Sequence, residues 1–337
     1  MARIYTLLLF ILSLLTACSE SNTGTPATFS GNRMTMEYRV LVGKKLNPVE
    51  REKVQKIILM TFSEIDSIYN KWNPKSEISR FNRHAETSPF TLSPELASFL
   101  DQTAMTVTLT NGKFDPTIEP AQKLWKDFLT NHREPGLYEI EKVKNIIGWH
   151  NIQMTELQAI KRYPEIQLDL GGIAKGYAID LITERLNQEG YPDLYVEWGG
   201  EIRTSGKHPE GRPWTICVSY MGIPDPSCAL DIVELNDEAV ASSGDYLQYW
   251  KTQDKTYTHI IDVRTACPLE VKRGSICSAT VTAPTCLLAD TLATAAMLFP
   301  NKEEAEKWLE QIRTRYPSVK YWILTRNEIP PHKFNNR

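Results

Sequence analysis

"CLLADTLATAAMLFP" (Cys286–Pro300) has the composition and spacing of a buried helix. Its apolar residues return at helical intervals, at Ala289, Leu292, Ala293, Ala296 and Met297. Asp290 and Thr294 interrupt this run four residues apart, so a helix would present both on one face. A carboxylate is rarely buried unless it is paired or binds a metal. Two interpretations are open: a hard-oxygen site that suits Mg²⁺, or a helix cap or ion pair.

Two Gly-Gly pairs lie outside this helix. In "DLGGIAKGYAID" (169–180), Gly171 and Gly172 follow a strand-like run and precede a helical pattern. The first turn of a helix offers free N–H groups that suit a phosphate, and Lys175 adds a positive charge there. The stretch has neither a Walker motif nor GxGxxG, and a tight packing turn is the alternative. The second pair, in "VEWGGEIRTSG" (196–206), indicates either a close approach to a ligand or a hairpin.

Two further stretches carry candidate polar groups. Asp115 precedes a proline in "NGKFDPTIEP" (111–120), which favours extended backbone and lets its side chain face a ligand. His259 lies in the strand-like "YTHIIDVRTACP" (257–268) and could act as a general base near neutral pH. A structural role for this histidine is the alternative.

The amino terminus has the features of a lipoprotein signal. A basic start and a short apolar run predict a signal peptide at 1–17, and the following "TAC" predicts lipidation of Cys18. The polar stretch to residue 32 predicts a flexible tether, so the mature domain at 33–337 would be anchored to a bacterial membrane, facing the periplasm or the exterior. An ordinary signal peptide with an incidental cysteine is the alternative. Five other cysteines remain, and a disulfide between Cys217 and Cys228 is one open interpretation.

Helical and strand-like runs do not alternate regularly, which predicts an α+β fold rather than a doubly wound sheet. Net charge is −3 with both signs mixed, so composition gives no support to a nucleic-acid partner. We expect a loop at 73–83. Helices are expected after Asn47 and Ser93 and at 173–188, 285–298 and 302–315. Strands are expected at 34–42, 165–169, 194–198, 201–205, 213–219, 229–235, 276–283 and 319–325.

Seven motifs occur in the order typical of the FAD:protein FMN transferases, the ApbE-type flavin transferase family, which this chain resembles over about residues 31–325. They are "SEISRFN", "GKFDPT", "DLGGIAKGYAID", "GGEIRTSG", "SSGDY", "HIIDVRT" and "ADTLATA". The resemblance implies one domain of mixed, largely antiparallel sheets packed against helices. It also implies a Mg²⁺-dependent reaction in which FMN passes from FAD to a threonine hydroxyl of a target protein and AMP leaves.

The resemblance assigns roles to particular positions. It implies that Asp290, Thr294 and the carbonyl of Ala174 bind the metal, with Asp290 and His259 as catalytic residues. The residues that it places on FAD are Met34, Trp72, Lys113, Phe114, Asp115, Gly171, Lys175, His259 and Ile261. The acceptor would be a membrane or surface redox subunit with a threonine flavinylation motif.

Three positions depart from the family pattern. Val263 and Ala266 replace a proline and a glycine after the histidine, and Glu201 replaces an aspartate or asparagine after the second Gly-Gly pair. Two other functions are open. The same site could hydrolyse FAD to FMN and AMP, or the lipoprotein could bind flavin without catalysis.

Overall fold

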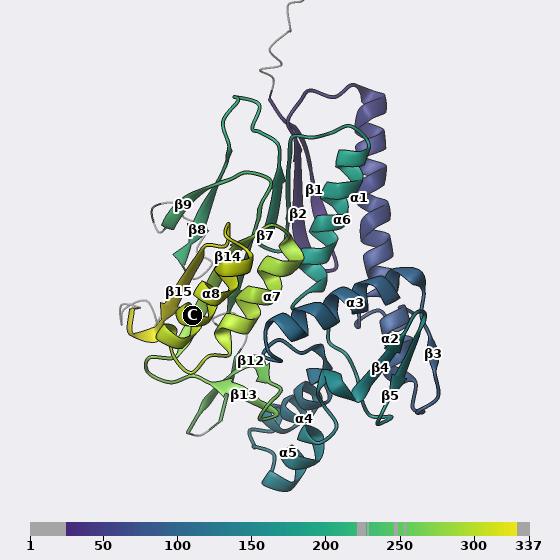
Figure 1. Cartoon of the computed structure of the whole chain (residues 1–337), viewed down its shortest axis with the longest axis vertical. Coiled ribbons are helices and arrows are strands. Elements are labelled where there is room, and N and C mark those ends of the chain that lie inside the picture. Colours follow the sequence, from purple (N-terminus) through teal and green to yellow (C-terminus); the bar gives the residue numbers. More distant parts are fainter. Residues whose placement is uncertain (1–24, 221–226, 228, 246–248, 253, 329–337) are drawn as a thin grey trace, which may run out of the picture.

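A seven-stranded antiparallel sheet lies at the centre of the chain (Figure 1). The computed structural model describes residues 25–220, 227, 229–245, 249–252 and 254–328. Strand order across the sheet is β1-β2-β6-β7-β10-β14-β15, so β2 pairs with a strand that comes about 150 residues later. The bounds are β1 (Ala27–Arg33), β2 (Met36–Val42), β6 (Leu194–Trp198), β7 (Glu201–Ser205), β10 (Ala239–Gly244), β14 (Ile276–Ala283) and β15 (Tyr321–Thr325).

Three smaller antiparallel sheets surround the central one. One joins β3 (Phe90–Thr91), β5 (Gln158–Lys161) and β4 (Ile152–Thr155). Another joins β11 (Tyr249–Lys251), β12 (Thr256–Asp262) and β13 (Cys267–Glu270). The third is the pair β8 (Trp214–Ser219) and β9 (Ala229–Leu235).

The two faces of the central sheet carry different layers. Along β6, the side chains of Leu194 and Val196 join the large core under the helices, whereas Tyr195 joins a second core with β8 and β9. This alternation is the period-two pattern of a strand that is covered on both sides. The helices are α1 (Pro48–Ile68), α2 (Glu77–Arg83), α3 (Pro94–Leu109), α4 (Glu119–Thr130), α5 (Leu137–Lys144), α6 (Ala174–Gln188), α7 (Cys286–Met297) and α8 (Lys302–Arg315).

Side-chain caps explain where several helices begin. Asn47 accepts the N–H of Glu50, and the Glu50 carboxylate accepts the N–H of Asn47, so a capping box starts the helix expected after Asn47. Ser93 caps α3 as predicted, and Asn301 caps α8. These caps are local in sequence, which is why the starts of the three helices follow from sequence alone.

The predicted α+β class and largely antiparallel sheets are confirmed, but three local predictions are wrong. Residues 73–83 are not all loop, because Ser76 caps α2 and Phe81 of that helix is buried. No strand forms at 165–169. The predicted tether ends too late, since Ala27–Arg33 pairs with β2 as β1. The strand expected at 34–42 starts at Met36 because Met34 and Thr35 form the hairpin turn with positive φ.

Several predictions concern residues that the structure does not describe. The signal peptide, Cys18 and Cys228 lie outside the described residues, so lipidation and the Cys217–Cys228 bridge stay predictions. Cys217, Cys267, Cys277 and Cys286 form no disulfide with one another. Within the described part of the chain, no helix is both long and apolar enough to cross a membrane.

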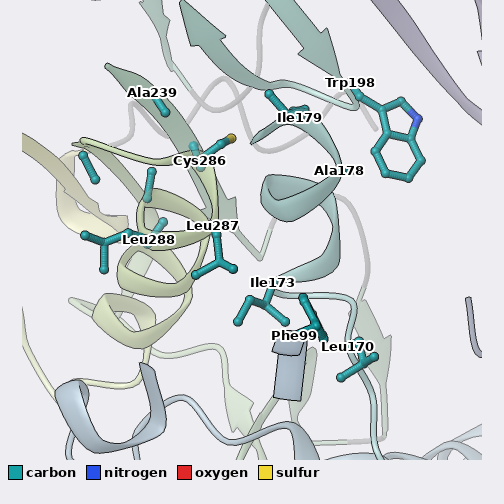
Figure 2. Close-up of a cluster of buried hydrophobic side chains, with 14 of the residues drawn as sticks. Phe99, Leu170, Ile173, Ala178, Ile179, Trp198, Ala239, Cys286, Leu287 and Leu288 are labelled. Carbon is teal, nitrogen blue, oxygen red and sulfur yellow. The ribbon is translucent and has the colours of Figure 1, made fainter. Parts of the chain in front are cut away.

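The backbones of helices α6 and α7 are in direct contact. A Cβ atom on Gly176 would lie 2.4 Å from the carbonyl oxygen of Cys286, so only glycine permits this approach. Figure 2 shows Ile173 and Leu287 between the two helices, and both belong to the large core. The contact fixes the first turn of α6 beside the first turn of α7.

A buried carboxylate on α6 caps α7. Asp180 accepts the N–H groups of Cys286 at 2.8 Å and Leu287 at 2.9 Å, and it also accepts Arg203 Nη1 at 2.7 Å. Burial raises the pKa of Asp180 to about 6, against the opposing effects of Arg203 and the two N–H groups. The side chain of Thr285 accepts a third N–H, that of Leu288.

At the carboxyl end of α7, Arg264 Nη2 donates to the carbonyl oxygen of Leu298 at 3.1 Å, so side chains bind α7 at both termini.

We predict that Asp180→Ala lowers the free energy of unfolding by about 3 kcal/mol, because it strips two helix N–H groups of their acceptor and breaks a buried ion pair. Urea denaturation measures the change. Glu184→Ala is the matched control: Glu184 accepts from the same Nη1 atom of Arg203 at 3.0 Å but its side chain is 50% exposed. We expect a control effect below about 1 kcal/mol. Equal effects of the two variants would show that the cap contributes nothing.

Candidate functional site

A cleft of about 430 Å³ opens where the β1–β2 hairpin, the end of α1 and the start of α6 meet. Its volume lies within the range of small-molecule sites. Five of the predicted site residues line it: Met34, Trp72, Gly171, Ala174 and Lys175. The other lining residues are Thr35, Met36, Ile65, Tyr69, Asn70, Lys71, Asp169, Leu170 and Trp198.

The rim of the cleft carries an unusually exposed aromatic ring. Trp72 is 75% exposed, and the ammonium groups of Lys71 and Lys126 lie 5.1 Å and 5.7 Å from its ring centre. An exposed indole flanked by cations provides a flat stacking surface and nearby positive charge. Those are the properties that a planar, anionic ligand would use.

The first Gly-Gly turn forms the floor of the cleft. Asp169 anchors it by accepting the N–H of Gly171 at 2.8 Å and by pairing with Lys71 at 2.9 Å. Burial alone would raise the pKa of Asp169, but Lys71 and the Gly171 N–H lower it below its usual value. No side chain caps α6 from Ile173, and the N–H of Ala174 donates to the carbonyl oxygen of Leu170 at 2.8 Å. The structure places Gly171 and Lys175 at one cleft, and phosphate binding by this turn stays a prediction.

Asp290 and Thr294 lie on the α7 face that meets this turn. Asp290 is 2% exposed, and its Oδ2 accepts a long hydrogen bond of 3.3 Å from the N–H of Gly176. A Cβ on Gly172 would lie 3.3 Å from Thr294 Oγ1, so the turn contacts the threonine. Thr285, not Asp290, caps α7, so the capping interpretation of Asp290 is wrong. The carboxylate and the hydroxyl instead flank the α6 terminus.

Lys175 is shared between two buried carboxylates. Its ammonium forms an ion pair with Glu201 Oε1, and it lies close enough to Asp290 to act on the pKa of that carboxyl. Burial raises the pKa of both acids, and Lys175 opposes the rise in each case. For Lys175 itself burial lowers the pKa, but Glu201 and Asp290 outweigh that and raise it above its usual value. The predicted lysine is therefore part of a charged cluster of three side chains.

The hydroxyl of Ser243 lies 2.9 Å from that of Thr294. Ser243 belongs to the "SSGDY" motif, near the end of β10. The hydrogen bond orients the threonine and brings the end of β10 to the site. The sequence does not reveal this role, because nothing local pairs the serine with a residue about 50 positions later.

The "GKFDP" stretch supports the site mainly by packing. Phe114 is buried and touches Gly172, since a Cβ there would lie 3.2 Å from its ring. Asp115 does not face the cleft: its carboxylate accepts Thr117 N–H at 2.9 Å and Trp149 N–H at 2.7 Å. The Nζ atom of Lys113 lies 3.9 Å from the ring centre of Phe299, away from the cleft lining.

His259 and Ile261 belong to β12, outside the cleft lining. His259 is half-buried, and its charge acts on the nearby Asp245. Burial raises the pKa of Asp245, while Arg326 and His259 oppose the rise. Because Asp245 follows the β10 strand that carries Ser243, His259 lies toward the same end of β10 as Thr294. Ile261 is 5% exposed and packs in a separate apolar core, so its side chain does not reach the cleft.

Sequence analysis also missed the residues that hold the site in place. Asn82, in "SEISRFN", accepts the N–H of Leu168 at 2.7 Å and donates to its carbonyl at 2.9 Å, which fixes the strand-like run before the Gly-Gly turn. Asp180 and Arg264 hold α7, as described above. All three lie inside motifs that were noticed, but their partners are distant in the sequence.

Among the described residues, no group of three or more His, Cys, Asp or Glu side chains could hold a metal ion. A cation at Asp290 would therefore depend on hydroxyl, carbonyl and ligand oxygens as well. Such a mixed oxygen set, completed by water and phosphate, is what Mg²⁺ uses. The arrangement places a carboxylate and a hydroxyl next to the Gly-Gly turn and the start of α6.

Comparison with known proteins agrees with this geometry. The ApbE family model matches residues 33–319. A protein of Chlamydia pneumoniae named FAD:protein FMN transferase is 41% identical over 299 residues, covering 88% of this chain and 91% of its own. One of the same name from Chlamydia muridarum is 40% identical over 309 residues, covering 91% and 94%.

Solved structures show the same fold. The flavin transferase ApbE of Vibrio cholerae has a TM-score of 0.75 at 27% identity, covering 90% of this chain and 94% of that one. The apo flavinyl transferase ApbE of Pseudomonas stutzeri has a TM-score of 0.78 at 25% identity, covering 90% and 92%. With a family model over most of its length and relatives at 40% and 41% identity, this chain belongs to the ApbE family.

Proposed function

We propose that this enzyme, an FAD:protein FMN transferase, moves FMN from FAD to a threonine hydroxyl of an acceptor protein with the help of Mg²⁺. The observation that carries the proposal is the contact of Asp290 with the first turn of α6 and of Thr294 with Gly172, next to a cleft that Gly171 lines. A phosphate-binding helix terminus and a hard-oxygen pair are the two parts that pyrophosphate chemistry needs side by side.

The residues at the site fit a divalent cation. Asp290 and Glu201 are both almost fully buried and have one ammonium, that of Lys175, between them. An excess of buried negative charge is costly unless a cation offsets it. Asp290, Thr294 Oγ1 and the carbonyl of Ala174 would hold Mg²⁺, which when bound would offset charge on the pyrophosphate and on the leaving phosphate.

The chain's own groups would bind and orient FAD. Ala174 and Lys175, at the positive end of α6, line the cleft where the pyrophosphate would lie. Trp72 would stack on a ring of the dinucleotide, and Met34 would border the same part of the cleft. Most of the rate enhancement would come from positioning and electrostatics.

In the proposed reaction, the threonine oxygen of the acceptor attacks the phosphorus atom of the FMN half. A new phosphorus–oxygen bond forms, the bond to the bridging pyrophosphate oxygen breaks, and AMP leaves with that oxygen. His259 is the proposed base for the hydroxyl proton. If water replaced the threonine, the same bond changes would release free FMN and AMP.

We predict that Asp290→Asn lowers the rate of flavin transfer at least 100-fold, because a neutral amide binds Mg²⁺ poorly. The assay contains purified protein, FAD, Mg²⁺ and an acceptor peptide with one threonine. It follows both in-gel flavin fluorescence and AMP release. Asp101→Asn, at an exposed carboxylate on α3, is the control and should keep the parent rate.

Other outcomes of this assay would change the assignment. AMP release that is equal with a threonine peptide and with its alanine counterpart, without labelled peptide, would establish hydrolysis instead. FAD binding without any AMP from the parent enzyme would establish a binding protein. Full activity in excess EDTA would contradict the role of Mg²⁺.

The proposed location is the outer surface of a bacterial membrane, through lipid on Cys18, and it rests on the small residues and cysteine after the apolar start. The acceptor would then be a membrane-bound or surface-exposed redox subunit. These features stand on the sequence pattern.

We predict that Cys18→Ser abolishes incorporation of radiolabelled palmitate in bacterial cells and moves the protein from the detergent phase to the aqueous phase of a Triton X-114 partition. Cys217→Ser, at an exposed cysteine of β8, should change neither property. Unaltered labelling of the Cys18 variant would refute lipidation at this residue.

A further inference from the structure

Glu201 is the feature of the site that the family resemblance leaves unexplained. It stands where the family commonly has aspartate or asparagine, directly after the second Gly-Gly pair. The side chain is almost completely buried, with 2% exposure for the residue. A longer carboxylate in a closed position needs a partner for each oxygen.

Only one of the two oxygens of Glu201 has such a partner. Oε1 pairs with the ammonium of Lys175, but Oε2 is buried and accepts no hydrogen bond from any described residue. Leaving a buried carboxylate oxygen unpaired is unfavourable. Gly199 lies beside this oxygen. Its φ of 65° favours glycine, and a Cβ at this position would lie 3.5 Å from Oε2.

The surroundings of Glu201 point to a missing positive charge. Lys175 lies between Glu201 and Asp290, and the charge of Asp290 acts on Glu201. Arg203 is already paired with Asp180 and Glu184. Two buried carboxyl groups, Glu201 and Asp290, therefore share the ammonium of Lys175, and burial raises the pKa of both.

We propose that Glu201 is a second carboxylate of the cation site, held in place by Lys175 and stabilising a bound divalent cation through its charge and its Oε2 oxygen. This inference rests on the proposed function of Asp290 and extends it to a residue outside the family's metal-binding set. The role explains both the burial of Glu201 and its unpaired oxygen. A carboxylate that supports a metal site from beside the direct ligands commonly changes metal affinity 10- to 100-fold.

The test is cation binding rather than turnover. Mn²⁺ replaces Mg²⁺ because its free form gives an electron paramagnetic resonance signal that disappears on binding. The dissociation constant is measured with and without FAD for the parent and for variants at Glu201, Glu197 and Asp290. Glu201→Gln should bind Mn²⁺ at least 10-fold more weakly in both conditions. Glu201→Asp keeps the charge and should lie closer to the parent.

Two controls make the result specific. Glu197→Gln removes a carboxylate four residues away, which pairs with Arg39 at 2.8 Å and is partly exposed, and it should keep the parent affinity. Thermal unfolding of each variant without metal separates weaker binding from misfolding. If Glu201→Gln fails to fold, Glu201→Ala replaces it and should also bind Mn²⁺ at least 10-fold more weakly, whereas Glu197→Gln should not.

The outcomes separate this inference from the proposed function. Loss of Mn²⁺ binding in Asp290→Asn, with a Glu201→Gln affinity within threefold of the parent, would overturn the role of Glu201 and leave the site at Asp290 intact. No Mn²⁺ binding by the parent in either condition, or unchanged binding in Asp290→Asn, would overturn both.

Discussion

The close contact between α6 and α7 is the constraint on which the site depends. Gly176 lets the backbones approach, and Asp180 locks the contact by capping the first turn of α7 from within α6. Because α6 begins after the Gly-Gly turn and α7 carries Asp290 and Thr294, the same contact that closes the core also sets the Gly-Gly turn beside these two side chains. Packing and chemistry therefore share one geometric origin.

Charge is organised around this contact in two buried groups. Asp180 and Arg203 form an ion pair that belongs to the fold, with the half-exposed Glu184 on the same guanidinium, whereas the buried Glu201 and Asp290 share Lys175. Two carboxylates buried around one ammonium are unfavourable unless further positive charge is near. This second group is the one for which we propose a bound cation.

The motifs visible in the sequence combine two kinds of residue. Lys175 lines the cleft, while Asp180, five positions later in the same motif, holds a helix more than 100 residues away. Asp115 shows the opposite case: its position before a proline predicted a ligand contact, but its carboxylate caps the local turn. Local patterns thus identify important segments more reliably than they assign a role to each side chain.

The sequence by itself determined helix starts with local caps, the buried helix with Asp290 and Thr294 on one face, the α+β class and the family. Each of these depends on residues a few positions apart or on the order of motifs. Only the tertiary structure decided which carboxylates share Lys175, how Ser243 meets Thr294, and that Asp115 turns away from the cleft. Those outcomes depend on strand order and helix contact between distant segments, which spacing along the chain does not encode.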